Sequence, residues 1–353
     1  MATGPKDLYQ KCRDYRDSAD ARAQGFYPYF RSIEEPHGNY VVCEGEQKIM
    51  IGSNNYLGLA QDPRVVEAAC DATRRYGAGC TGSRLLNGTI KLHVELEEAL
   101  AAFLGREASI LYSTGFFANQ GALVALTEDG DAILCDRENH ASIIDGCQFA
   151  PAKLIPFRHN SAESLENRLK RLSDEVGRMV ILDGVFSMSG DIADLPSIVP
   201  VAKRHGAMVY VDEAHSLGVL GRQGRGTVDH FGLHDDVDIV MGTFSKSLAS
   251  LGGYMASSKE VIDFVKYTSR PFIFSAAIPP ANAMTALEAL RMLREDNTRP
   301  KKLLDIASYM RNKLNQYNLP IGSDSIVPII PIYTYSRLRT LIAVKMLFEK
   351  GVY

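Results

Sequence analysis

Short apolar segments of β type alternate with amphipathic segments along most of the chain, from about residue 46 onward. Seven apolar segments read as strands that are apolar throughout: ASILYS (108–113), DAILCD (131–136), KLIPF (153–157), MVILDGV (179–185), AMVYVDE (207–213), DIVMGTF (238–244) and GGYMAS (252–257). Helical stretches lie between several of them, such as SAESLENRLKRLSDE, with Ser161 or Ser164 as its N-cap. This alternation predicts an α/β fold with a mostly parallel, seven-stranded sheet that is covered on both faces by helices.

The two ends of the chain follow a different pattern. Residues 1–45 read as a helical arm followed by a short extended piece, and PPANAMTALEALRMLRED (279–296) reads as a long helix that leads into a smaller unit. We therefore expect an N-terminal arm (1–45), a large domain (46–275) and a small C-terminal α/β domain (276–353). The sequence ends abruptly at FEKGVY, so we expect the small domain to be incomplete.

The composition argues against several classes of function. Hydrophobic residues make up 46% of the 353 positions, which is ample for a large core. Charged residues make up 23%, the formal net charge is −3 and no block of Lys and Arg is present, which argues against electrostatic binding of nucleic acid. The polar N-terminus is unlike a secretory signal, and no apolar run approaches the ~20 residues of a membrane span. Six scattered cysteines without a C-x-x-C pair indicate a reduced, cytoplasmic protein.

Three strings look like known motifs but lack the context that those motifs need. GAGCTG (77–82) matches the dinucleotide pattern G-x-G-x-x-G, yet it follows a stretch with helical spacing, so a turn is the better interpretation. VDEAH (211–215) contains a helicase string, but the chain has no phosphate loop. His140, His159 and His215 lack the spacing of metal ligands, and we expect no metal site.

Two charged residues follow predicted buried strands. Asp212 ends AMVYVD, and Lys246 lies just after DIVMGTF, within GTFSKSLASLGG (242–253). Ligands of parallel sheets bind beyond the carboxyl ends of the strands. A buried carboxylate is costly unless it meets a cation, so one interpretation is a structural ion pair between Asp212 and Lys246. The other is that both groups face one cofactor.

Pyridoxal phosphate (PLP) fits the second interpretation. Lysine forms imines with aldehydes, and an aspartate can hold the ring nitrogen protonated. STGFFANQG (113–121) offers a Ser-Thr-Gly turn and a helix N-terminus for the phosphate, and Thr243 and Ser245 add hydroxyls. His140 could stack on the ring, or it could simply cap a helix or lie in a loop.

Seven segments, taken together and in this order, resemble the α-oxoamine synthases. They are GSNNYLGL (52–59), GCTGSRLLNGT (79–89), STGFFAN (113–119), NHASIIDG (139–146), DGVFSMSGDIA (183–193), VDEAHSLGVLGRQGRG (211–226) and GTFSKSLASLGG. The resemblance covers about residues 25–350. It implies a PLP-dependent enzyme of fold type I that condenses an amino acid with an acyl-CoA and releases CO2.

Within that family the chain most resembles the bacterial serine palmitoyltransferases, through YPYFRSIE (27–34), GCTGSRLLNGT and GTFSKSLAS. This implies condensation of L-serine with palmitoyl-CoA to 3-oxosphinganine, CoA and CO2, the first step of sphingolipid synthesis. Two alternatives remain. One is another member of the family with a different amino acid or acyl-CoA, of the 8-amino-7-oxononanoate synthase or 2-amino-3-ketobutyrate CoA ligase type. The other is a non-catalytic partner subunit.

The resemblance also assigns roles to individual residues. Lys246 forms the imine with the cofactor, Asp212 holds the ring nitrogen, and His140 stacks on the ring and orients the substrate carboxylate. His215 falls near the phenolic oxygen, and Asn54 and Ser187 line the site. The residues implied around the phosphate are Gly115, Phe116, Thr243, Ser245 and, from RPFIFSAAIPP (270–280), Ser275.

The resemblance further implies a homodimer whose active site lies at the subunit interface. From the apolar pattern we expect no integral membrane segment, and peripheral contact with a membrane stays open. Phe116 departs from the family, where many members carry tyrosine, so a backbone N–H contact would survive and a phenol contact would not. A carboxylate-binding arginine is expected beyond Tyr353.

Overall fold

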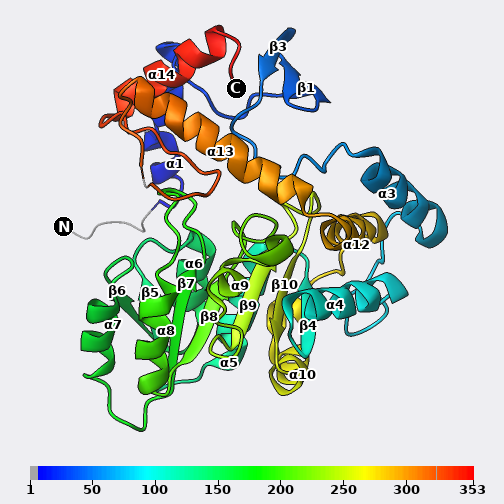
Figure 1. The fold of residues 1–353 in the computed structure, drawn as a ribbon, viewed down its shortest axis with the longest axis vertical. Helices are drawn as coiled ribbons and strands as arrows, with labels where there is room; N and C mark the ends of the chain where they lie inside the picture. The colour runs from blue at the N-terminus through cyan, green and yellow to red at the C-terminus, as the bar shows by residue number, and fades with distance from the viewer. Residues whose placement is uncertain (1–6, 323) are drawn as a thin grey trace. The chain divides into compact units, whose positions relative to one another are not determined.

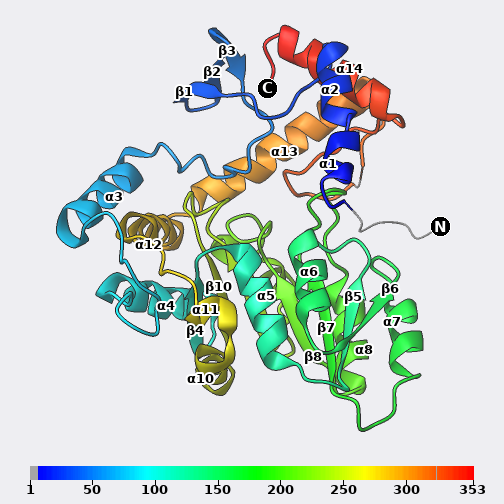
Figure 2. The same cartoon turned by 180° about the vertical axis from the view of Figure 1, so that it is seen from behind.

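The computed structural model describes residues 7–322 and 324–353 and divides into two compact units. One unit combines the residues up to Ser53 with Tyr333–Tyr353, and the other is Asn54–Ile332. The sequence-based boundaries near residues 45 and 275 stay a prediction. Both views of the chain show the large sheet inside the second unit (Figures 1 and 2).

The second unit is built on a seven-stranded sheet in the order β4-β10-β9-β8-β7-β5-β6. Its strands are β4 (Ala108–Tyr112), β5 (Ala132–Asp136), β6 (Lys153–Phe157), β7 (Arg178–Asp183), β8 (Met208–Asp212), β9 (Ile239–Thr243) and β10 (Gly253–Ser257). β10 is antiparallel to both of its neighbours, and the other pairs are parallel. The seven predicted strands are all present, and the predicted mostly parallel sheet is confirmed.

The strands are apolar throughout because each contributes to two cores. Along β8, Val209 and Val211 belong to one core and Tyr210 to the other. In Figure 2 the helices α5, α6 and α11 lie in front of the sheet, and in Figure 1 α8 and α9 lie in front of it. Alternate residues of a strand point to opposite faces, so a sheet covered on both sides needs apolar residues at every position.

Eleven α-helices are described in the second unit: α3 (Pro63–Tyr76), α4 (Lys91–Leu104), α5 (Gly115–Leu126), α6 (Ala141–Phe149), α7 (Ala162–Leu169), α8 (Leu195–Arg204), α9 (Thr227–Phe231), α10 (Lys259–Thr268), α11 (Arg270–Ile273), α12 (Pro280–Glu295) and α13 (Thr298–Gln316). Short polar side chains begin several of them. Ser161 caps α7 by accepting from the backbone N–H of Ser164, and Asp62 caps α3. In the part of the chain that the structure describes, we find no helix with the length and apolarity to span a membrane.

The described residues of the first unit form a small sheet and three helices: β1 (Ile33–His37), β2 (Tyr40–Cys43), β3 (Glu46–Ile49), α1 (Gln10–Asp14), α2 (Asp17–Ala23) and α14 (Arg337–Glu349). β2 pairs antiparallel with both neighbours. A bridge between Ile49 and Val352 joins the small sheet to the residues after α14. The Arg31 and Lys48 cations lie over the Phe348 ring at 3.8 and 4.6 Å. These contacts bring the two ends of the chain together within this unit.

The GAGCTG string does not form a dinucleotide site. Gly77 caps the C-terminus of α3 with a φ of 83°, a left-handed conformation that favours glycine. The string therefore follows a helix, and the next helix begins only at Lys91. A dinucleotide site needs the glycines between a strand and a helix.

Candidate active site

The site begins where β7 and β8 end. The register of these parallel strands pairs Asp183 with Asp212, and Asp212 pairs with Met241 of β9 on its other side. Lys246 follows β9 in the loop before β10. Burial lowers the pKa of the Lys246 amine, while the nearby carboxylates of Asp212 and Asp183 act in the opposite direction. The amine and both carboxyl groups therefore lie within electrostatic reach of one another.

Lys246 and Asp212 do not form a direct ion pair. Within the residues that the structure describes, no carboxylate lies within 4.0 Å of Lys246 Nζ and no hydrogen bond to this amine is recorded. Asp212 is instead held by the protein itself. Its Oδ2 accepts from Asn119 Nδ2 at 2.8 Å, and its Oδ1 accepts from the Ala214 backbone N–H at 2.9 Å. The structural ion pair that the sequence left open is not observed.

Asp183 is the second carboxyl group of the site. Its Oδ2 accepts from the backbone N–H of His140 at 2.9 Å, and its own N–H donates to Asn139 Oδ1 at 2.9 Å. Burial raises the pKa of the Asp183 carboxyl well above its usual range, and the charge of Asp212 adds to the effect. Asp183 therefore anchors the segment that carries His140.

His140 is the N-cap of α6. Its Nδ1 accepts from the Ser142 backbone N–H at 3.2 Å and lies 2.7 Å from Ser142 Oγ. The residue as a whole is exposed. The interpretation of His140 as a capping histidine thus describes its local structure correctly, and the exposed edge of the ring stays available for a ligand.

His215 contacts Tyr56 and lies within electrostatic reach of Lys246. Its Nδ1 lies 2.7 Å from the Tyr56 hydroxyl. Burial, with smaller contributions from Lys246 and His140, lowers the pKa of His215 to about 3. Burial also raises the pKa of the Tyr56 phenol, so the hydroxyl keeps its proton and donates to the imidazole.

The start of α5 packs against the end of β9. A Cβ added to Gly115 would lie 2.9 Å from Thr243 Cβ, and one added to Gly253 would lie 2.6 Å from Gly115 Cα. Thr243 Oγ1 lies 2.9 Å from Ser245 Oγ. Thr114 caps α5 by accepting from the Phe117 N–H at 3.1 Å. Among the described residues, the backbone N–H groups of Gly115 and Phe116 have no acceptor. Two free N–H groups and two hydroxyls thus meet at the first turn of α5.

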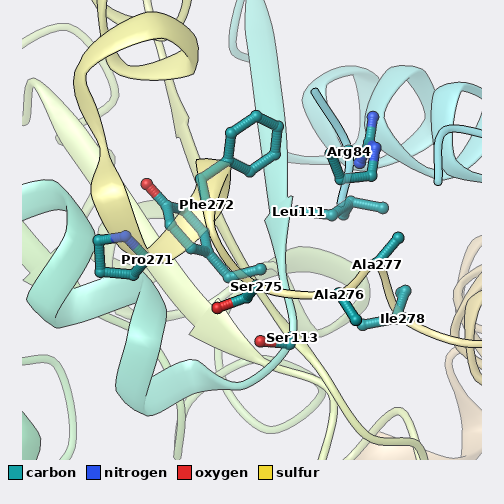
Figure 3. Close-up of a pocket in the computed structure, with 10 residues that line it drawn as sticks. Arg84, Leu111, Ser113, Pro271, Phe272, Ser275, Ala276, Ala277 and Ile278 are labelled. Carbon is teal, nitrogen blue, oxygen red and sulfur yellow. The ribbon is translucent and has the colours of Figure 1, made fainter. Parts of the chain in front are cut away.

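Ser275 lies in a small pocket that Ser113, at the end of β4, also lines (Figure 3). The segment around Ser275 is tied to the 79–89 loop, because Ala277 N–H donates to the Gly82 carbonyl at 2.9 Å and Ser83 bridges to Ala276. Ser275 is therefore close to the strand that leads into the start of α5.

Asn54 and Ser187 lie in turns near the site. The Asn54 carbonyl accepts from the Tyr56 N–H at 2.8 Å, which places it two residues from the partner of His215. Ser187 is partly buried in the turn that the Gly190 N–H to Phe186 carbonyl bond closes. Over residues 7–322 and 324–353, no recorded hydrogen bond joins either side chain to Lys246 or Asp212.

Five polar residues of the site were missed by sequence reasoning: Tyr56, Asn119, Ser142, Asp183 and Tyr210. Asp183 follows the apolar run MVIL just as Asp212 follows MVYV, so the rule that found one could have found the other. Asn119 lies one helical turn after Gly115, within a segment already singled out. Tyr56 and Tyr210 give no local signal, because their partners come from distant parts of the chain.

Comparison with known proteins places this site in a family. The model of the aminotransferase class I and II family matches residues 46–353. The serine palmitoyltransferase of Bacteroides ovatus is 43% identical over 346 residues, which is 98% of this chain and 88% of that protein. The chain is an α-oxoamine synthase of the class I and II aminotransferase family.

Other α-oxoamine synthases support the same placement. The 8-amino-7-oxononanoate synthase of Thermosipho melanesiensis is 45% identical over 334 residues, covering 95% of this chain and 85% of that protein. The solved structure of a serine palmitoyltransferase from S. paucimobilis, with bound PLP–myriocin aldimine, is 36% identical. It superimposes with a TM-score of 0.95 over 99% of this chain and 88% of that one. The predicted family and fold type are confirmed.

Proposed function

We propose that this α-oxoamine synthase is a PLP-dependent serine palmitoyltransferase. It joins Cα of L-serine to the acyl carbon of palmitoyl-CoA and releases CoA and CO2, which gives 3-oxosphinganine. The observation that carries the proposal is the unpaired Lys246 amine within electrostatic reach of the buried Asp212 carboxylate. A half-buried lysine without a partner is costly unless a ligand uses it.

The residues fit PLP at both ends of the cofactor. At the phosphate end, the free N–H groups of Gly115 and Phe116 lie beside the hydroxyls of Thr243 and Ser245. A helix N-terminus with unpaired N–H groups favours a dianion. Ser275 adds a hydroxyl from its neighbouring pocket. Phe116 contributes only its backbone N–H, so the contact does not need the phenol of the tyrosine that many family members carry at this position.

PLP supplies an aldehyde for the lysine and a ring that delocalises a negative charge at Cα. Lys246 would hold the aldehyde through its Nζ, and its free amine would take the Cα proton of the amino acid as general base. Burial supports this role because it lowers the pKa of the amine. Asp212 would accept a hydrogen bond from the protonated ring nitrogen and so keep that nitrogen protonated. Its two hydrogen bonds from Asn119 and Ala214 hold it in place for this purpose.

Two histidines complete the catalytic group. His140 would stack on the cofactor ring and bind the substrate carboxylate, while its Nδ1 edge is held by Ser142. His215 stays neutral, and because Tyr56 occupies its Nδ1, its Nε2–H would be the donor to the phenolic oxygen of the cofactor. Asn54 would line the substrate side of the site and Ser187 the cofactor side.

The assembly is a homodimer with each site completed by the partner. Large apolar side chains are exposed on loops near the site, with Leu86 at 81%, Met188 at 81% and Phe274 at 79% of full exposure. A second copy would bury them. Light scattering should give twice the mass of the 353-residue chain. A cytoplasmic location accords with six cysteines that are all free thiols.

A single assay tests the function and its alternatives. The PLP-loaded protein is given palmitoyl-CoA with L-serine, L-alanine or glycine, and CoA release and the lipid product are measured. Serine-dependent CoA release with 3-oxosphinganine as product supports the proposal. Release with another amino acid assigns a different α-oxoamine synthase activity. PLP binding without release of CoA favours a non-catalytic partner subunit.

A further inference from the structure

A chain of hydrogen bonds runs beneath the site from Tyr210 to His140. The Tyr210 hydroxyl donates to Asn119 Oδ1 at 2.9 Å, and Asn119 Nδ2 contacts Asp212 Oδ2 at 2.8 Å and Ser142 Oγ at 2.9 Å. Ser142 Oγ lies 2.7 Å from His140 Nδ1. The links between the two ends are buried, since Asn119 is 0% and Ser142 is 2% exposed. Buried chains of this kind have few alternative arrangements.

The orientation of the Asn119 amide is fixed from two sides. Burial raises the pKa of the Tyr210 phenol well above its usual range, so its hydroxyl keeps the proton and donates to the amide oxygen. The Asp212 carboxylate accepts only, so it requires the amide nitrogen. If the amide were flipped, Asn119 Oδ1 would face Asp212 Oδ2, and neither oxygen could donate a hydrogen bond. The second N–H of Asn119 therefore donates to Ser142 Oγ.

The direction of the hydrogen bond from Asn119 to Ser142 decides which ring nitrogen of His140 carries the proton. Because Ser142 Oγ accepts from Asn119, its own proton is free for His140 Nδ1. The Ser142 backbone N–H also donates to Nδ1, at 3.2 Å. A nitrogen that accepts from two donors carries no proton, so the proton of a neutral imidazole lies on Nε2.

We propose that Asn119 and Ser142 are positioning residues that fix His140 as the Nε2–H tautomer and tie its ring to Asp212. The exposed Nε2–H then offers a donor to the carboxylate of the amino-acid substrate. The other tautomer would aim an Nδ1–H at the Ser142 N–H and a lone pair at the substrate carboxylate. This inference rests on the proposed function for the identity of the substrate, but the tautomer itself does not depend on turnover.

The first experiment reads the tautomer directly. The PLP-loaded protein, labelled with ¹⁵N in its eight histidines, is studied by NMR without substrate, and His140→Gln identifies the ring signals. We expect an unprotonated Nδ1 and a protonated Nε2 in the unmodified protein. A protonated Nδ1 with an unprotonated Nε2 would overturn the proposal, whatever the protein catalyses.

The second experiment removes the link. In Ser142→Ala we expect a measurable population of the Nδ1–H tautomer and a KM for L-serine that rises about three- to tenfold, the effect of one lost hydrogen bond. PLP affinity should change less than about twofold, because Asp212 keeps Asn119. Ser142→Thr, which retains the hydroxyl, should recover most of the KM. The relay is the hydrogen-bond chain from Asn119 through Ser142 to His140. An unchanged tautomer and an unchanged KM in Ser142→Ala would refute its role.

A matched control separates positioning from packing. Ser109 is also buried, at 4% exposure, and its hydroxyl donates to the Glu97 carbonyl at 2.7 Å, outside the relay. Ser109→Ala should lower the free energy of unfolding by about as much as Ser142→Ala does. It should leave the His140 tautomer and the KM for L-serine unchanged. Equal changes in both variants would mean that Ser142 acts through stability alone. If the unmodified protein shows the expected tautomer but does not condense serine, the relay stands and the proposed function fails.

Discussion

Asp183 and Asp212 lie side by side at the carboxyl ends of β7 and β8, paired in the register of the sheet. Two buried carboxyl groups at adjacent positions are not readily ionised together. Asp212 accepts two hydrogen bonds, whereas burial and the charge of Asp212 raise the pKa of Asp183. The pair therefore divides its roles: Asp212 accepts hydrogen bonds from Asn119 and Ala214, and Asp183 is the carboxyl group whose ionisation burial opposes.

This division predicts a pH dependence of stability. As the pH rises above 3.8, Asp183 ionises in the unfolded chain but keeps its proton in the folded one. Unfolding then releases a proton, so this group makes the free energy of unfolding fall as the pH rises, until the folded carboxyl also ionises. Asp183→Asn should flatten this dependence and still accept from the His140 N–H. Denaturant unfolding of both proteins at several pH values tests this, and parallel curves would contradict it.

His215 predicts a dependence of the opposite sign. The unfolded histidine takes up a proton near pH 6.5, and the folded one only near pH 3. The free energy of unfolding should therefore fall as the pH drops from about 6.5 to 3, because the unfolded state binds more protons. His215→Asn should lose stability less steeply over this range. His37→Asn is a control, because His37 is exposed in the small sheet. The same pH dependence of the free energy of unfolding in His215→Asn and His37→Asn would contradict this prediction.

The contact between Gly253 and Gly115 predicts a steric effect. A methyl group on residue 253 would meet the backbone of α5 at 2.6 Å, so Gly253→Ala should lower the free energy of unfolding by about 1–3 kcal/mol. It should also weaken PLP binding, because it displaces the first turn of α5. Gly79→Ala is the control, since a Cβ there meets nothing within 4 Å. Equal PLP affinity in the two variants would argue against a phosphate site at this turn.

Much of the sheet could be predicted because burial on both faces leaves a local signal. The seven apolar runs identified the strands, and an acidic residue after the AMVY run identified Asp212. The reversal of β10 left no such signal in the run itself. It follows from the short connection 244–252, which has no crossover helix and so allows only an antiparallel return.

The polar contacts of the site could not be predicted in the same way. Tyr56 and His215 are 159 positions apart, and their contact depends on how the 54–59 segment approaches the end of β8. The Asn119 amide meets three partners from β8 and α6, and none is encoded by spacing along α5. Burial with satisfied polar groups is a property of the packed structure, and sequence patterns report it only indirectly.

Arg84, which lines the Ser275 pocket, forms a buried pair with Glu97. Their side chains are 8% and 10% exposed, and two bonds of 2.8 and 3.0 Å join them. Arg84→Met leaves a buried carboxylate without its partner and should lower the free energy of unfolding by about 3 kcal/mol. Arg158→Met, which removes an exposed pair with Glu163, should change it by less than about 1 kcal/mol. Thermal or denaturant unfolding decides, and similar losses in both variants would contradict this.

The identity of the cofactor lysine is the central claim. Borohydride reduction of the PLP-loaded protein fixes the cofactor on the lysine that binds it, and mass spectrometry of the digested protein locates the modified residue. We predict a pyridoxyl group on Lys246, and loss of both this adduct and the visible absorbance of the bound cofactor in Lys246→Ala. An adduct on another lysine, or undiminished visible absorbance in Lys246→Ala, would contradict the account.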